Sequence, residues 1–173
     1  VTSFKQVAAD QTTSQRRTFC LDEVVHEIAL TLGPSLRHSV AQLSVEIPEG
    51  IRMESYPGPL GQIIANLITN ATIHAFTDRQ QGHIRIIAVA SDQQVQIWVG
   101  DDGVGIPANL LPRIFDPFVT SRMGRGGTGL GLHIALNIAQ NVLGGRISAT
   151  SVEGSGTIFE LEIPLVAPQP TEA

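Results

Sequence analysis

The sequence predicts an α+β domain in which helices cover one face of a mixed, mostly antiparallel sheet. Three segments carry apolar residues at helical spacing, and each is followed by two short runs that are typical of strands. Short turns join the two strands of each pair, so hairpins dominate and no series of strand–crossover–strand units runs through the chain. This order of elements argues against a Rossmann-type parallel sheet.

The first helix is expected over residues 21–32, where Gly33-Pro34 should stop or kink it. A strand at residues 40–47, a turn at Pro48-Glu-Gly50 and a short strand at residues 51–55 come next. The later elements are expected in this order: the most regular helix at 58–76, strands at about 83–90 and 94–101, a short helix near Pro107, a loop over 115–127, a helix over 130–142, and a closing hairpin of strands 146–151 and 157–163.

The composition of the 173 residues excludes several classes of protein. An apolar content of 42% suits one domain with a hydrophobic core. Eleven basic and 16 acidic side chains give a net charge of −5, which argues against a nucleic-acid partner. Cys20 is the single cysteine, which excludes an internal disulfide and fits a reducing cytosol. No apolar run approaches the roughly 20 residues of a membrane span, so we expect a cytoplasmic domain without direct membrane contact, whether or not its parent protein is anchored.

Three polar side chains form one row on the helix expected at residues 58–76. Asn66, Asn70 and His74 are spaced i, i+4 and i+8, so they share a face. Asparagine is a middling helix former, and two of them on one row cost stability without an obvious structural return. An amide oxygen suits Mg²⁺, which keeps several waters and takes other ligands from phosphate. The row therefore indicates a magnesium–phosphate site, with an ordinary solvated helix face as the alternative.

The strand expected at residues 94–101 ends in Asp101-Asp-Gly-Val-Gly105. Strand alternation places Asp101 on the apolar face of that strand, whereas Asp102 faces the other way or enters the turn. A carboxylate on an apolar face needs a partner, and the exocyclic amine of adenine would serve. Gly103 and Gly105 would let the backbone pass close to a flat base. The alternative is a common Asp-Asp-Gly turn at the end of a strand.

A glycine-rich segment, Arg125-Gly-Gly-Thr-Gly-Leu-Gly-Leu132, leads directly into the helix expected at 130–142. Backbone N–H groups exposed at a helix start form an anion site, and Thr128 could cap the helix or contact a phosphate. Arg122 and Arg125 could reach phosphate as mobile cations. The alternative is a glycine-rich linker or helix cap.

Between these two motifs, Phe115-Asp-Pro-Phe118 would anchor a loop hinge on the core, or form a satellite apolar cluster under a loop. The order of the four motifs on one chain is more specific than any one of them. Over roughly residues 19–165 that ordered set resembles the histidine kinase catalytic domain, of the superfamily shared with DNA gyrase, Hsp90 and MutL. The matching boxes are the N box at Asn66-Leu-Ile-Thr-Asn70-Ala, the G1 box at Asp101-Asp-Gly-Val-Gly105, the F box at Phe115-Asp-Pro-Phe118 and the G2 box at Gly127-Thr-Gly-Leu-Gly131-Leu.

The resemblance implies a Bergerat-type two-layer α/β sandwich that binds ATP and Mg²⁺. By this resemblance Asn70 would bind the metal, Asn66 would lie near the phosphates, and Asp101 would accept the adenine amine. Residues from about 119 to 126 would form a flexible lid. The remaining nucleotide contacts that we carry over are Gly103, Gly105, Arg122, Arg125, Gly127, Thr128, Gly129, Leu130 and Gly131.

Two departures from the family pattern concern catalysis. Kinases of this family often have lysine or arginine three positions after the second N-box asparagine, where this chain has Ile73. His74, one place on, is the candidate for the role of that basic residue, and Asn66 and His74 are the candidate catalytic residues. The phosphoacceptor histidine of the family lies on a helical hairpin well upstream of the N box. His26 belongs instead to a core-packed helix and lies too close to the N box to be that acceptor. We therefore expect residues 1–18 to be the end of a dimerisation hairpin and a linker, 19–166 the ATP-binding domain and 167–173 a tail.

The resemblance implies transfer of the ATP γ-phosphoryl to a histidine on a separate dimerisation domain of the same parent protein. That parent would be a homodimeric sensor kinase, which passes the phosphoryl group to a response regulator. A hydrolase of the gyrase, Hsp90 or MutL kind would need a glutamate at the first N-box position, where this chain has Asn66. A nucleotide-dependent binding module, or a degenerate kinase domain without transfer activity, is the remaining alternative.

Overall fold

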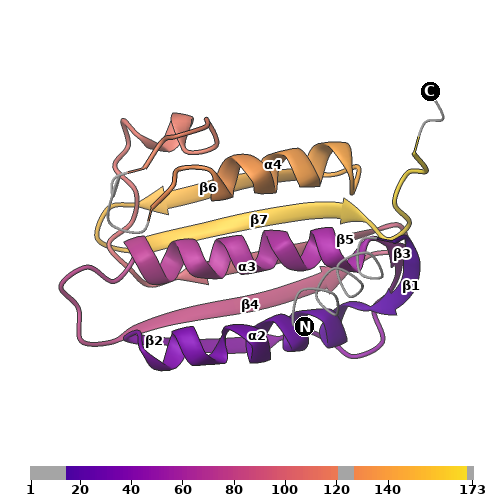
Figure 1. Ribbon diagram of the computed structural model, residues 1–173, viewed down its shortest axis with the longest axis horizontal. Helices are drawn as coiled ribbons and strands as arrows, with labels where there is room; N and C mark the ends of the chain where they lie inside the picture. Colours follow the sequence, from indigo (N-terminus) through magenta and orange to yellow (C-terminus); the bar gives the residue numbers. More distant parts are fainter. Residues whose placement is uncertain (1–14, 121–126, 171–173) are drawn as a thin grey trace, which may run out of the picture.

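Five strands form the main sheet of the protein, in the spatial order β2-β4-β5-β7-β6. The computed structural model describes residues 15–120 and 127–170. The strands are β2 (Ala41–Glu46), β4 (Gly82–Ala90), β5 (Gln94–Asp101), β6 (Arg146–Val152) and β7 (Gly156–Pro164). β2 runs parallel to β4, and the other neighbours are antiparallel (Figure 1). The expected mixed, mostly antiparallel sheet is therefore confirmed.

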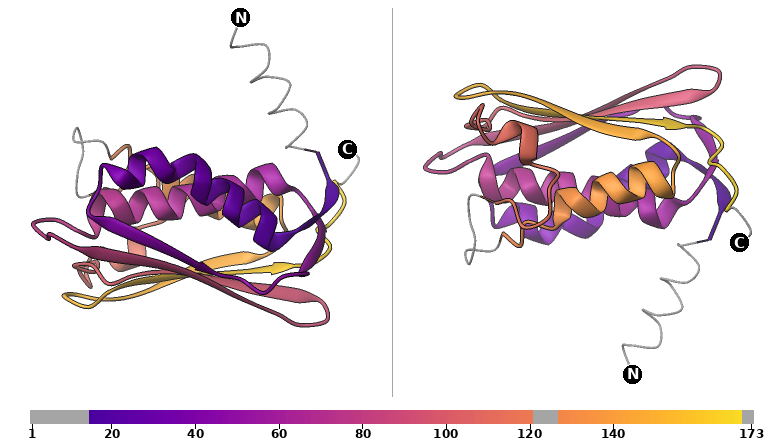
Figure 2. Two further views of the ribbon diagram at one scale, coloured as in Figure 1. Left: turned by 90° about the horizontal axis from the view of Figure 1, so that it is seen from below. Right: turned by 90° about the horizontal axis from the view of Figure 1, so that it is seen from above.

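Three helices lie side by side on one face of this sheet and form the second layer of the sandwich (Figure 2). They are α2 (Leu21–Arg37), α3 (Pro57–His74) and α4 (Gly131–Asn141), with α3 between the other two (Figure 1). A one-turn 3₁₀ helix at Leu111–Arg113 stands where a short helix was expected near Pro107.

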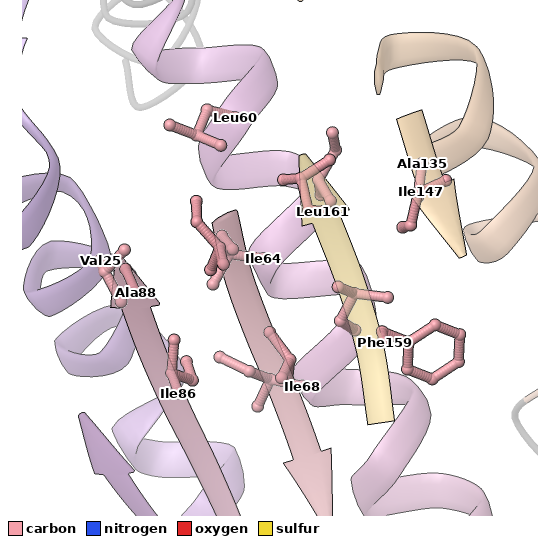
Figure 3. Close-up of a cluster of buried hydrophobic side chains, with 14 of the residues drawn as sticks. Val25, Leu60, Ile64, Ile68, Ile86, Ala88, Ala135, Ile147, Phe159 and Leu161 are labelled. Atoms are coloured by element: carbon pink, nitrogen blue, oxygen red, sulfur yellow. The ribbon is translucent and has the colours of Figure 1, made fainter. Parts of the chain in front are cut away.

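The core lies between α3 and the sheet (Figure 3). Helical spacing brings Leu60, Ile64 and Ile68 to the same face of α3, and all three are at most 1% exposed. Alternate residues of each strand meet them, as Ile86 on β4 and Leu161 on β7 illustrate, with exposures of 0% and 1%. The polar side chains of α3 are consequently directed away from the sheet, toward the side of the molecule where α4 begins.

A second, two-stranded sheet closes one end of the domain and differs from the expected pairing. Strand β1 (Arg17–Cys20) pairs antiparallel with β3 (Arg52–Ser55), so the strands near residues 41 and 55 do not form a hairpin with each other. The chain after β7 joins this sheet through the Glu54–Val166 bridge, and Ala167 is 2% exposed. Apolar alternation indicated β2 and β3 but carried no information about their partners, and β1 was missed because four residues show too little alternation.

The first helix also differs from its expected length. α2 continues through Gly33 and Pro34 to Arg37 instead of stopping at Leu32. A proline inside a helix removes one backbone N–H, which leaves the carbonyl of Leu30 without its helical donor. Leu30 is 79% exposed, so water can satisfy that carbonyl. Within the residues that the structure describes, no helix combines the length and the apolar character needed to cross a membrane.

The packing of α3 gives a prediction for stability. Ile64→Ala should lower the free energy of unfolding by about 2–5 kcal/mol, because it removes a fully buried side chain and leaves a cavity. Leu30→Ala is the control, since the same loss of carbon atoms on an exposed helix surface should change stability by less than about 0.5 kcal/mol. Urea unfolding followed by circular dichroism measures both. Equal losses for the two variants would contradict the placement of the core.

Candidate functional site

A cavity of about 270 Å³ lies between the polar row of α3 and the glycine-rich segment before α4. The row supplies Asn66, Asn70 and His74, as the sequence predicts, and the cavity is also lined by Thr69 and Ile73 from the same helix. Its opposite wall contains Gly127, Thr128, Gly129 and Gly131. The described part of this lining contains no Asp, Glu, Lys or Arg side chain, so the cavity offers amides, an imidazole, hydroxyl groups and glycine backbone to a ligand.

A second cavity of about 450 Å³ adjoins the first and is mainly apolar. Asn70, His74 and Leu132 line both cavities, so the two spaces share a wall. The apolar residues of its lining are Val104, Ile106, Pro107, Leu110, Ile114, Val119 and Leu132, and Asp78 contributes a carboxylate. Together the two compartments suit an elongated ligand with one flat apolar end and one polar or anionic end.

Sequence reasoning missed this apolar compartment. Ile106 and Pro107 directly follow the Asp101–Gly105 motif, and apolar residues recur at positions 110, 111 and 114. That spacing was a usable signal for one apolar face on the segment after the motif. Glu153, from the hairpin between β6 and β7, also lines this cavity, and nothing near it in sequence indicated so.

Asn66 links the helix layer across the site. Its side-chain amide nitrogen, Nδ2, donates a 3.0 Å hydrogen bond to the backbone oxygen of Gly131, the first residue of α4. The bond ties the middle of α3 to the beginning of α4, and therefore fixes the width of the polar cavity. Asn66 thus combines a structural contact with a position on the cavity wall.

Asp101 ends β5 with its side chain on the inner face, as strand alternation predicts. Its Oδ1 accepts a 2.9 Å hydrogen bond from the backbone N–H of Gly103. Burial raises the pKa of Asp101, and hydrogen bonds from the backbone N–H groups of Gly103 and Thr157 offset this only in part. Asp101 and Gly103 do not line either cavity in the described structure, whereas Gly105 lines the apolar one. Asp101 is therefore a carboxylate whose burial is only partly compensated, in the motif whose Gly105 lines the apolar cavity.

Asp102 points away from the cavities, toward β4 and the loop before it. It accepts hydrogen bonds from the backbone N–H of His83 at 2.8 Å and from the ring nitrogen Nδ1 of His83 at 3.1 Å. Arg79 pairs with it at 3.9 Å and also donates to its backbone oxygen. Although partial burial raises the pKa of Asp102, the hydrogen bonds from His83 outweigh this and hold that pKa below its usual range. The two adjacent carboxylates therefore have opposite environments.

The turn after Asp101 packs directly on the end of α3. The backbone N–H of Val104 donates to the carbonyl oxygen of Ala75 at 2.8 Å. A Cβ atom on Gly103 would collide with the same oxygen, so the position requires glycine. This contact places the turn, and with it Gly105, at the end of the asparagine row.

A backbone hydrogen bond joins the glycine-rich segment to the F box. Phe118 donates its backbone N–H to the carbonyl oxygen of Gly129 at 2.8 Å. Gly129 has a φ of 69°, and a Cβ atom there would lie 2.6 Å from the carbonyl carbon of Phe118. The close approach of the two backbones therefore explains the glycine.

Thr128 does not cap α4. Its hydroxyl oxygen accepts from the backbone N–H of Leu130 at 3.3 Å, while Leu130 precedes the helix and makes no side-chain cap bond. Leu130 does not line the cavities in the described structure. Arg122 and Arg125, and with them most of the expected lid at residues 119–126, lie outside the described residues. Val119 and Thr120 are described, and both line the two cavities.

Comparison with known proteins agrees with this arrangement. Residues 56–167 match the family model described as histidine kinase-, DNA gyrase B- and HSP90-like ATPase. The structure of the nucleotide-free catalytic domain of histidine kinase ThkA superimposes with a TM-score of 0.77 and 30% sequence identity, covering 88% of this chain and 97% of that one. A structure of histidine kinase ThkA in complex with response regulator protein TrrA has the same fold, with a TM-score of 0.71 and 24% identity over 94% of this chain and 48% of that one.

Among curated proteins, the chain is similar to signal transduction histidine-protein kinase AfsQ2 of Streptomyces coelicolor, with 33% identity over 83% of this chain and 26% of that protein. It is also 33% identical to sensor histidine kinase RcsC of Escherichia coli, over 98% of this chain and 18% of that protein. The chain thus spans about a quarter or less of these two relatives. Residues of the N, G1 and G2 boxes line one pair of cavities. With the family match over residues 56–167, this chain belongs to the family of histidine kinase-, DNA gyrase B- and HSP90-like ATPases, as a histidine kinase catalytic domain.

Proposed function

We propose that this domain binds Mg²⁺–ATP and transfers the γ-phosphoryl group to a histidine on a separate dimerisation domain of its parent protein. The observation that carries the proposal is the shared wall between a neutral polar cavity and an apolar one, with Asn70 and His74 at the junction. Adenine fits the apolar compartment and the triphosphate fits the polar one, beside the glycine backbone.

The environment of Asp101 supports its assignment to adenine. Its pKa is raised because burial is only partly offset by hydrogen bonds, so the free domain contains a carboxylate that a further donor would stabilise. The exocyclic amine of adenine is such a donor. Gly105 lines the apolar compartment, and the packing of Gly103 on Ala75 holds the turn that contains both glycines against the end of α3.

The metal assignment rests on Asn70. Among the described residues no group of three or more His, Cys, Asp or Glu side chains could hold a metal ion, so an all-protein cage is absent from that part of the chain. Mg²⁺ commonly takes most of its ligands from phosphate and water. An amide oxygen from Asn70, which lines both cavities, fits this requirement, and the bound ion would neutralise phosphate charge.

Transfer would proceed by positioning rather than by strong acid–base chemistry. The acceptor imidazole nitrogen forms a bond to the γ-phosphorus while the bond from that phosphorus to the β–γ bridging oxygen breaks, and ADP departs. Asn66 and His74 border the phosphate compartment, and Gly127, Thr128, Gly129 and Gly131 line it. We assign Arg122 and Arg125 to the same phosphates on the basis of their place in the sequence.

The parent protein is proposed to be a homodimeric sensor kinase that donates its phosphoryl group to a response regulator. The histidine kinase ThkA was solved in complex with such a regulator, which supports this kind of partner. In this proposal residues 1–18 end the dimerisation hairpin and linker, 19–166 form the catalytic domain and 167–173 the tail, with the packing of Ala167 extending the ordered domain to that residue.

The alternatives meet specific objections. A water-activating base at the first N-box position is excluded because Asn66 cannot accept a proton, and its amide nitrogen is bonded to Gly131. A binding module without transfer activity would share the cavities but would fail the transfer experiment below.

Asp101→Asn should weaken ATP binding by about 1.5–3 kcal/mol, because it removes a charge-assisted hydrogen bond. Asp102→Asn, the matched control, should have a much smaller effect, since Asp102 faces His83 and Arg79. Isothermal titration calorimetry measures both. A far larger loss for Asp102→Asn would contradict the assignment of Asp101.

The same Asp101→Asn variant should keep or gain stability in the absence of nucleotide. The pKa of Asp101 is raised in the folded state, so wild-type stability falls relative to the variant as pH rises from the unfolded pKa through the folded one. At neutral pH the variant should therefore unfold at an equal or higher temperature than wild type. A marked loss of stability would instead show that Asp101 has mainly a structural role.

Asn70→Ala should abolish phosphotransfer and the magnesium dependence of nucleotide binding while the fold is retained. The reason is the loss of the amide oxygen assigned to the metal. Transfer to a supplied acceptor hairpin domain is assayed with labelled ATP, and circular dichroism confirms folding. Unchanged transfer by the variant would overturn the metal assignment.

The isolated chain should bind ATP without phosphorylating any of its own histidines, because in-line transfer needs an acceptor aligned with the γ-phosphate. Adding the hairpin domain of the parent protein should produce acid-labile, base-stable phosphate on that domain. Stoichiometric phosphohistidine on these 173 residues alone would contradict the separate acceptor and make His26 the first candidate. Binding of ATP with no transfer to the added hairpin would favour the binding-module alternative.

A further inference from the structure

His133, in the first turn of α4, makes two hydrogen bonds through its two ring nitrogens. Nδ1 lies 3.1 Å from the backbone oxygen of Phe115, and Nε2 lies 3.2 Å from the side-chain nitrogen Nδ2 of Asn137. A carbonyl oxygen only accepts, so Nδ1 carries a proton and donates to Phe115. In the neutral ring Nε2 is then an acceptor, which the amide N–H of Asn137 satisfies. The two contacts together define one tautomer of His133.

Phe115 is thereby held from two sides. Its ring meets that of Phe159 on β7 edge to face, with ring centroids 6.3 Å apart, while its carbonyl oxygen accepts from His133 on α4. The ring contact fixes Phe115 to the sheet and the hydrogen bond fixes it to the helix layer. The backbone of the F box therefore cannot shift relative to α4 without losing one of these contacts.

The residues that follow Phe115 form walls of both cavities. Phe118, three positions after Phe115, donates its backbone N–H to the carbonyl oxygen of Gly129. Val119 and Thr120 follow, and both line the polar and the apolar compartments. The bond of Phe118 to Gly129 and the bond of Phe115 to His133 therefore both help to set the position of these wall residues.

We propose that His133, held in its Nδ1–H tautomer by Asn137, is a positioning residue for the nucleotide site. It lines neither cavity in the described structure, so it acts through Phe115 and the wall residues rather than on the nucleotide itself. The inference rests on the proposed ATP binding for its functional readout, whereas its tautomer can be read without any nucleotide.

If His133 only filled space, a residue of similar volume could replace it without a hydrogen bond to Phe115. Leucine fills a similar volume and suits a helix at least as well as histidine, but it cannot donate to the Phe115 carbonyl. Asparagine can, because its amide nitrogen lies about where the imidazole Nδ1 lies, although it fills less space. Hydrogen bonding and volume thus predict opposite rankings of His133→Leu and His133→Asn.

The test compares His133→Leu and His133→Asn with wild type and with Gln140→Ala, an exposed substitution on the same helix. Calorimetric titration uses a non-hydrolysable ATP analogue with Mg²⁺. His133→Leu should weaken binding roughly three- to tenfold, in line with the loss of one hydrogen bond. His133→Asn should recover most of that loss, and Gln140→Ala should bind like wild type. Recovery by leucine but not by asparagine, or equal binding by all four proteins, would overturn the proposal.

Nitrogen NMR of selectively labelled histidine provides the second measurement, in the nucleotide-free protein under conditions where the ring is neutral. The resonances of His133, assigned by their loss in His133→Asn, should show the proton on Nδ1. Asn137→Leu should shift the tautomer equilibrium away from that form. A proton on Nε2 in wild type would overturn the positioning role even if ATP binds. Failure of wild type to bind the analogue, with the Nδ1–H tautomer present, would contradict the proposed ATP binding instead.

Discussion

The burial of one face of α3 against the sheet is the constraint on which the site depends. Ile64 and Ile68 are fully buried, so the helix has no freedom to rotate about its axis. The row of Asn66, Asn70 and His74 is consequently held at the border with α4, where the bond from Asn66 to Gly131 defines the opening. The same hydrophobic contact that stabilises the domain thus determines where the polar side chains of α3 lie.

Several residues in the motifs around the site lower the stability of the fold. Their presence is explained by the groups and backbone segments that they hold in place. The buried carboxylate of Asp101 has a raised pKa, and burial of a charge opposes folding. Gly103 and Gly129 each lose more conformational entropy on folding than another residue would. Each, however, permits a close approach of two backbone segments that any side chain would prevent. Residues that are unfavourable for stability are expected at binding sites, where function rather than stability determines the residue type.

Local patterns predicted the three helices, the strands other than β1, and the asparagine row, because spacing along the chain determines which residues share a face. Such patterns do not predict which distant segments pair with each other. The parallel pairing of Ala41 with Gly82 spans a whole helix, and the apolar alternation of β2 would fit a hairpin equally well. The bond between Phe118 and Gly129 and the apolar compartment around Ile106 likewise depend on tertiary packing. The motifs could therefore be predicted from the sequence, whereas the tertiary contacts that form the cavity walls could not.

The charge of the polar cavity determines how a triphosphate could be held there. The lining that the structure describes contains no lysine or arginine, and Ile73 stands at the position where the helix could have supplied one. Under the proposed function, neutralisation of the phosphates would then come from backbone N–H groups, from a divalent cation, from His74, and from Arg122 and Arg125 outside the described residues. A helix that supplies no fixed cation to the described lining would leave more of the neutralisation to the metal. It follows that ATP binding here should lose more on removal of Mg²⁺ than binding in a site whose helix supplies a permanent cation.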